Sequence, residues 1–143
     1  MDVKVNMLAV LLGTVASMVI GTVWYMPKVF GNAWMKMAKV KMGDGSMAWS
    51  MGTAVVSSFL MAYVLAHLTS IAHSFSVNTE STNTFMRDAL LTGFWSWVGF
   101  FSVRAFMRGE FNLRRKKETF IHVMNDLATI LAMVLIIGAL GVK

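Results

Sequence analysis

The sequence predicts an all-α polytopic membrane protein with four transmembrane helices and a short interfacial helix between the first and the second. Hydrophobic residues make up 57% of the 143 residues and charged residues only 14%, whereas soluble domains carry about 25% charged residues. Each of four long apolar runs could cross the roughly 30 Å hydrocarbon layer of a bilayer as a helix. A chain of this length is expected to form one membrane domain, residues 1–143.

The four spans are expected at about residues 5–26, 47–74, 88–107 and 120–142. A cleaved signal peptide is the alternative for the first run. No small-residue cleavage signal follows that run, however, and three further apolar runs do. We therefore expect the first run to remain in the membrane as a span.

Composition excludes several classes of protein. The chain has no cysteine, which excludes disulfides, thiol catalysis and Cys-based metal sites. Its 14 methionines are scattered without ligand spacing, so they fit flexible apolar filler better than a Cu(I) site. No glycine-rich phosphate loop and no nucleophile motif occurs. We expect no catalytic residue, no metal and no cofactor.

The basic residues predict the orientation of the bundle. Nine of them lie in the first and third loops, against three on the other side. The positive-inside rule places these two loops in the cytoplasm and both termini outside, in a multi-pass protein of the cytoplasmic (inner) membrane. This clustering also makes nucleic acid an unexpected partner. The third loop could bind anionic lipid, at about 1 kcal/mol per basic residue. The nine are Lys28, Lys36, Lys39, Lys41, Arg108, Arg114, Arg115, Lys116 and Lys117.

The first loop is expected to hold a short helix on the membrane surface. Phe30, Trp34, Ala38 and Met42 recur every four residues within residues 28–42. An apolar face beside lysines is typical of an interfacial helix. A plain connector and a gate or docking element are both open interpretations.

Polar side chains form one face of the fourth span. His122, Asn125, Asp126 and Thr129 fall at i, i+3, i+4 and i+7, which places them on one side of a helix. A carboxylate in lipid costs at least about 2.5 kcal/mol, so such groups usually face a protein interior and mark functional sites. Asp126 is therefore the first candidate site residue.

Asp126 has two interpretations. An ion pair with Arg104, near the cytoplasmic end of the third span, would reduce the cost of burying either charge. Asp126 would lie roughly 9 Å inside the span, on the same side of the membrane. Alternatively, His122 titrates near neutral pH and could exchange protons with the carboxylate one turn away. A divalent metal would need a third ligand, and none is evident.

Small residues predict where helices pack. They recur every four residues in the first two spans, and such faces let membrane helices approach closely. The stripe on the second span winds around the helix, so we expect it to contact more than one neighbour, within one chain or across subunits. The packing candidates are Gly13, Ser17 and Gly21 in the first span and Ser58, Ala62 and Ala66 in the second.

A short motif after the first span resembles a known family. It reads Trp24-Tyr25-Met26-Pro27, then Phe30-Gly31 and Ala33-Trp34-Met35. This pattern resembles the domain-of-unknown-function family 1761 of small integral membrane proteins. The resemblance covers most of the chain, implies a four-helix membrane bundle and carries no assigned activity. Family members often have a Tyr-His pair near Asn125-Asp126, where this chain departs, so the resemblance implies a polar position there and not the carboxylate itself.

Two functions are consistent with these patterns. The first is transport of a proton, ion or small solute by a homo-oligomer, with Asp126 and His122 as the coupling residues. The second is a non-transporting accessory or assembly subunit of a membrane complex, whose polar groups only hold helices together. An enzyme is the third class. The sequence does not identify a substrate.

Overall fold

The computed structural model describes residues 4–39, 46–77, 84–111 and 116–141. These segments are almost entirely helical and contain no strand. In chain order the elements are α1 (Met7–Trp24), the π-helical turn η1 (Pro27–Gly31), α2 (Asn32–Ala38), α3 (Met47–Val77), α4 (Phe85–Ser96), the π-helical segment η2 (Trp97–Ser102), α5 (Val103–Phe111) and α6 (Lys116–Leu140).

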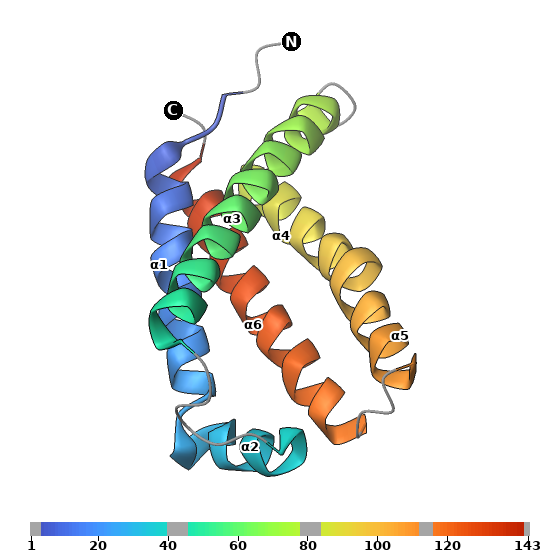
Figure 1. The fold of residues 1–143 in the computed structure, drawn as a ribbon. Helices are drawn as coiled ribbons and strands as arrows, with labels where there is room; N and C mark the ends of the chain where they lie inside the picture. The colour runs from blue at the N-terminus through green and yellow to red at the C-terminus, as the bar shows by residue number, and fades with distance from the viewer. Residues whose placement is uncertain (1–3, 40–45, 78–83, 112–115, 142–143) are drawn as a thin grey trace.

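Three helices in the described part of the chain are long and apolar enough to cross a membrane, namely α1, α3 and α6. The third expected span is also helical throughout, because α4, η2 and α5 follow one another without a break. Its π-helical middle separates two shorter α-helices. Figure 1 shows α1, α3, the α4–α5 run and α6 alternating in direction, with both termini at one end and α2 at the other.

The basic residues of the two expected cytoplasmic loops belong to elements at the α2 end. Lys28 and Lys36 lie in η1 and α2, Arg108 lies in α5, and Lys116 begins α6. Some residues of the predicted loops and of the C-terminus lie outside the described residues. They are Lys41, Met42, Arg114, Arg115 and Lys143. We call the α2 end the basic end and the opposite end the terminal end.

A short helix forms in the first loop, as predicted, and consists of η1 and α2. Because a residue before proline disfavours helical backbone, Met26 is extended (φ −59°, ψ 143°) and α1 stops before Pro27. The Gly31 amide then donates to the Met26 carbonyl at 3.0 Å, which closes the π-helical turn. A Cβ on Gly31 would lie 2.9 Å from the Met26 carbonyl carbon and closer still to the Tyr25 oxygen. Only glycine fits this turn, which directs α2 across the end of the bundle.

The packed core occupies the half of the bundle nearer the termini. Its largest fully buried side chains are Ile130, Met133 and Ile137 of α6 and Val10 of α1. Around them lie α1, α3 and α4, all of which pack against α6 or against each other. Large apolar side chains on the outer faces of these helices remain exposed, as a lipid-facing surface requires.

Small residues set the helix spacing in this core. The Ser17 and Ser58 hydroxyls lie 2.9 Å apart across the α1–α3 contact. A Cβ on Gly13 would meet Ala62 of α3 and Met133 of α6 at 3.6 Å each. Ala62 and Ala66 are buried. The predicted stripes therefore lie where α1, α3 and α6 meet.

Two glycines let α4 and α6 approach closely. A Cβ on Gly93 would lie 2.7 Å from Cγ1 of Val134, and one on Gly138 would lie 3.1 Å from the Met86 Cα. Both distances are shorter than van der Waals contact. These helices can therefore approach this closely only because Gly93 and Gly138 have no side chain.

We predict that Gly93→Ala lowers stability by about 1–3 kcal/mol, because the added methyl group collides with the stiff, buried Val134. Gly99→Ala is the matched control, since a Cβ at Gly99 in η2 meets nothing within 4 Å. The thermal midpoint of each purified variant in mild detergent measures the effect. Equal midpoints for the two variants would contradict the close α4–α6 contact.

Candidate functional site

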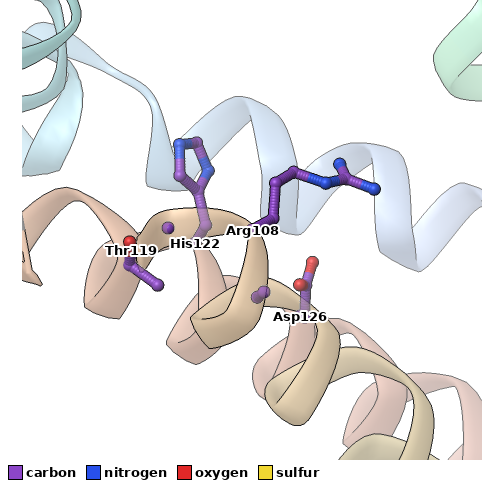
Figure 2. A pocket seen from close by; sticks show the side chains of 6 residues that line it. Arg108, Thr119, His122 and Asp126 are labelled. Atoms are coloured by element: carbon purple, nitrogen blue, oxygen red, sulfur yellow. The ribbon is translucent and has the colours of Figure 1, made fainter. Parts of the chain in front are cut away.

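The polar face of α6 borders two cavities in the half of the bundle nearer the basic end. The first, which we call the arginine pocket, has a volume of about 310 Å³ and lies between α5 and α6. Figure 2 shows His122 and Asp126 on one side of α6, with the Arg108 side chain in the same space. Its walls are Ala105, Arg108, Gly109, Thr119, His122 and Asp126.

The second cavity, which we call the serine pocket, has a volume of about 610 Å³ and lies between α1, α3 and α6. Its walls carry both hydroxyl groups and thioethers. Asn125 adds an amide group and Asp126 adds a carboxylate. Several wall residues, including Thr22 and Met51, are exposed, so the cavity opens between α1 and α3. The walls are Ser17, Met18, Gly21, Thr22, Tyr25, Ser50, Met51, Ala54, Ser57, Ser58, Met61, Asn125, Asp126 and Thr129.

Asp126 is the residue common to both cavities. The expected ion pair with Arg104 does not form: no N–O contact within 4.0 Å joins these two described residues, and Arg104 is exposed. The sequence prediction placed the wrong arginine near Asp126. Arg108, one helical turn further along α5, lines the arginine pocket instead.

The turn after α1 contacts the polar face directly. The Tyr25 hydroxyl and His122 Nδ1 share a hydrogen bond of 2.6 Å. The Trp34 ring of α2 packs edge-on against both, with centroids 5.6 Å from Tyr25 and 6.5 Å from His122. Trp24 packs on Phe30 in the same turn at 4.8 Å. The aromatic motif and the polar face thus form one site.

Two buried polar atoms of this region make no hydrogen bond among the described residues. They are Oδ1 of Asn125 and Nε1 of Trp24. Asn125 also lines the serine pocket. A buried acceptor without a partner costs about 1–3 kcal/mol, so Asn125 is an energetically unfavourable residue at the wall of the serine pocket.

A hydrogen bond from η2 fixes the middle of the polar face. Nε1 of Trp97 donates to the Val123 carbonyl at 3.1 Å, and Val123 directly follows His122. Single π-helical turns are frequent at functional sites. The sequence predictions do not include this contact, because it joins helices that are far apart in the chain.

A second polar pair lies at the terminal end. Nδ1 of His73 in α3 and Oδ2 of Asp88 in α4 are 2.6 Å apart, and the Asp88 side chain is only 7% exposed. Phe85 packs edge-on against His73, with centroids 5.1 Å apart. This pair was not predicted, because Asp88 was interpreted only as the boundary of a span. No group of three or more His, Cys, Asp or Glu side chains with metal-site spacing occurs in the described segments.

The predicted site residues separate into two sets. Asn125, Asp126, Thr129 and Tyr25 line the serine pocket together with Ser17, Gly21 and Ser58, which had been predicted for packing alone. Gly13, Ala62 and Ala66 lie instead in the apolar core. Gly21 lines the open space of the serine pocket and is not packed against a neighbouring helix, since a Cβ there would meet nothing within 4 Å.

Comparison with known proteins gives one match. The family model described as "Protein of unknown function (DUF1761)" matches residues 8–138. This range includes the aromatic motif, both cavities and Asp126. No curated protein and no solved structure matches the chain.

We predict that Tyr25→Phe lowers stability by about 1 kcal/mol through loss of the hydrogen bond to His122. Tyr63→Phe, on the exposed surface of α3, is the matched control. The effect of Tyr25→Phe should disappear in a His122→Ala background, because the two residues act as a pair. An undiminished effect in that background, measured by thermal unfolding, would contradict the contact.

Proposed function

This chain belongs to the DUF1761 family of proteins of unknown function, and we propose that it is a four-span membrane protein that moves a proton, ion or small solute through the site around Asp126. The observation that carries the proposal is the position of Asp126. Its carboxyl group lines two cavities in the membrane-spanning part of α6 and makes no ion pair within 4.0 Å among the described residues. A lone carboxylate in a membrane helix is expensive and is rarely retained without a use.

Two access routes to one carboxyl group suggest an exchange mechanism. A protonated carboxyl group is neutral and no longer attracts a cation. A cation beside the group favours the charged carboxylate and so promotes loss of the proton. In our proposal the cation occupies the serine pocket and the proton leaves through the arginine pocket. His122, in the wall of the arginine pocket, is one helical turn away and can accept that proton.

We further propose that the protein works as a homo-oligomer in the cytoplasmic membrane, with α2 and the basic end in the cytoplasm. Four helices enclose little space, and apolar core residues fill the half of the bundle beyond Asp126. A complete pathway therefore forms more easily between subunits. Lys116 and Lys117 of the basic end are placed to contact anionic lipid.

The rival function is a non-transporting accessory or assembly subunit. It is favoured by the bonds that join α6 to its neighbours, from Tyr25 to His122 and from Trp97 to Val123. Such bonds would hold a scaffold together equally well. The role of Asp126 distinguishes the two functions, because neither bond involves it.

Single cysteines test the four-span arrangement, and the chain has none of its own. We predict that Thr84→Cys reacts with an impermeant maleimide in intact spheroplasts. Lys36→Cys and Lys117→Cys should react only after the membrane is permeabilised, since both lie at the basic end. Labelling of Thr84→Cys and Lys117→Cys from the same side would show that residues 85–111 do not cross the membrane.

Proton and cation flux into liposomes tests transport. We predict that wild type dissipates an imposed gradient and that Asp126→Asn slows this flux by about tenfold or more, because an amide cannot exchange a proton. Glu110→Gln is the matched control, since Glu110 is an exposed carboxylate of α5 that lines neither cavity. Wild-type flux equal to that of empty liposomes would exclude transport.

Two further measurements, of thermal stability and of the dependence of flux on the protein-to-lipid ratio, complete the flux experiment. If Asp126→Asn lowers the thermal midpoint but leaves flux unchanged, the carboxylate is structural and the accessory function is favoured. A flux that rises more steeply than linearly with the protein-to-lipid ratio supports a homo-oligomer. Strict proportionality down to single chains per vesicle would exclude one.

A further inference from the structure

The size and chemistry of the serine pocket indicate the class of molecule that it binds. Its volume of about 610 Å³ falls in the range of small-molecule sites, about 300–1,000 Å³. An inorganic cation such as Ca²⁺ needs about 6–8 oxygens at close range. A cavity of this volume is much larger than one ion and offers it a single charged ligand, Asp126, since its other oxygens are those of neutral side chains. The pocket therefore fits an organic molecule better than a bare ion.

Polar acceptors are concentrated in the α6 wall of the pocket. Asp126 supplies a carboxylate without an ion pair, and the neighbouring Asn125 Oδ1 is buried without a hydrogen bond among the described residues. The Thr129 hydroxyl is on the same face of α6. Acceptors grouped in this way favour a positively charged group that donates hydrogen bonds or carries a fixed charge.

The walls from α1 and α3 carry neutral hydroxyl groups, such as those of Ser17 and Ser58, together with adaptable apolar side chains. They include the thioethers of Met18, Met51 and Met61, and unbranched methionine side chains adjust to irregular apolar shapes. None of the described residues that line the pocket is basic. Anions therefore find no positive partner there, and a hydrophobic body can lie against the methionines.

We propose that the serine pocket binds a small amphipathic organic cation, with its ammonium group against Asp126 and its apolar body against the methionines of α1 and α3. The proposal rests on the transport function and names its substrate class. The solute therefore binds in the serine pocket and not in the arginine pocket, which lies on the other side of Asp126.

Equilibrium binding to the full-length protein in lipid nanodiscs tests this assignment. The probe is benzyltrimethylammonium, which carries a fixed positive charge, and the control ligand is neopentylbenzene, its neutral isostere of the same shape. We expect saturable binding of the cation and at least about tenfold weaker binding of the neutral isostere. Equal binding of the two ligands, or no binding of the cation, would overturn the proposal.

Variants locate the bound cation. Asp126→Asn should weaken its binding by at least about tenfold, and Asp126→Glu should restore most of it. Gly21→Leu fills the pocket and should abolish binding, whereas Gly52→Leu should leave it unchanged. Both glycines have open space at Cβ, but only Gly21 lines the serine pocket. Undiminished binding by Gly21→Leu would overturn the assignment even if Asp126→Asn does not fold.

The binding result and the flux result can fail separately. Proton flux that depends on Asp126, without binding of the organic cation, would overturn only the substrate class. Binding of the cation without any flux would overturn transport and leave the pocket as a binding site. In our proposal Gly21→Leu loses cation binding and cation-driven proton flux together, because both use the carboxyl group of Asp126.

Discussion

The rest of the structure depends on the contact of α4 with α6 at Gly93 and Gly138. Lipid provides no hydrophobic force that pushes helices together, so close backbone approach and van der Waals packing hold the bundle. The two glycines bring α4 against α6 in the half nearer the termini. Ile130, Met133 and Ile137 fill that half completely. The two cavities therefore lie in the other half, nearer the basic end.

The polar groups occupy the half that this packing leaves open. Asp126 and Asn125 lie on the α6 face that points into protein and not into lipid, which reduces the cost of a carboxylate in the membrane. The turn at Pro27 then brings Tyr25 and Trp34 onto His122. The aromatic motif therefore has a physical role: it packs α2 against the polar face of α6 and fixes the position of His122.

Much of the fold could be predicted from the sequence, because each apolar run and each stripe of small residues is a local pattern. The helices α1, α3 and α6 lie where the apolar runs predicted them, and Gly13, Ala62 and Ala66 lie in the core. The π-helical segment η2 could not be predicted, since it has no marked sequence pattern. The level at which α5 packs beside α6 is likewise not encoded locally, so the sequence could not decide between Arg104 and Arg108 as the arginine nearer Asp126. Pairings between distant helices, such as His73 with Asp88, depend on packing that no single segment encodes.

Asp88 and Asp126, carboxylates in opposite halves of the bundle, have different surroundings. Asp88 is buried and joined to His73 at 2.6 Å, which ties α3 to α4 and closes the terminal end. Asp126 has no ionic partner within 4.0 Å among the described residues and borders two cavities. A bundle closed at one end and open at the other corresponds to one of the two states that alternating access requires. Transport of the proposed kind therefore requires a second state in which α3 and α4 separate at His73 and Asp88, while the turn at Tyr25 stays against His122.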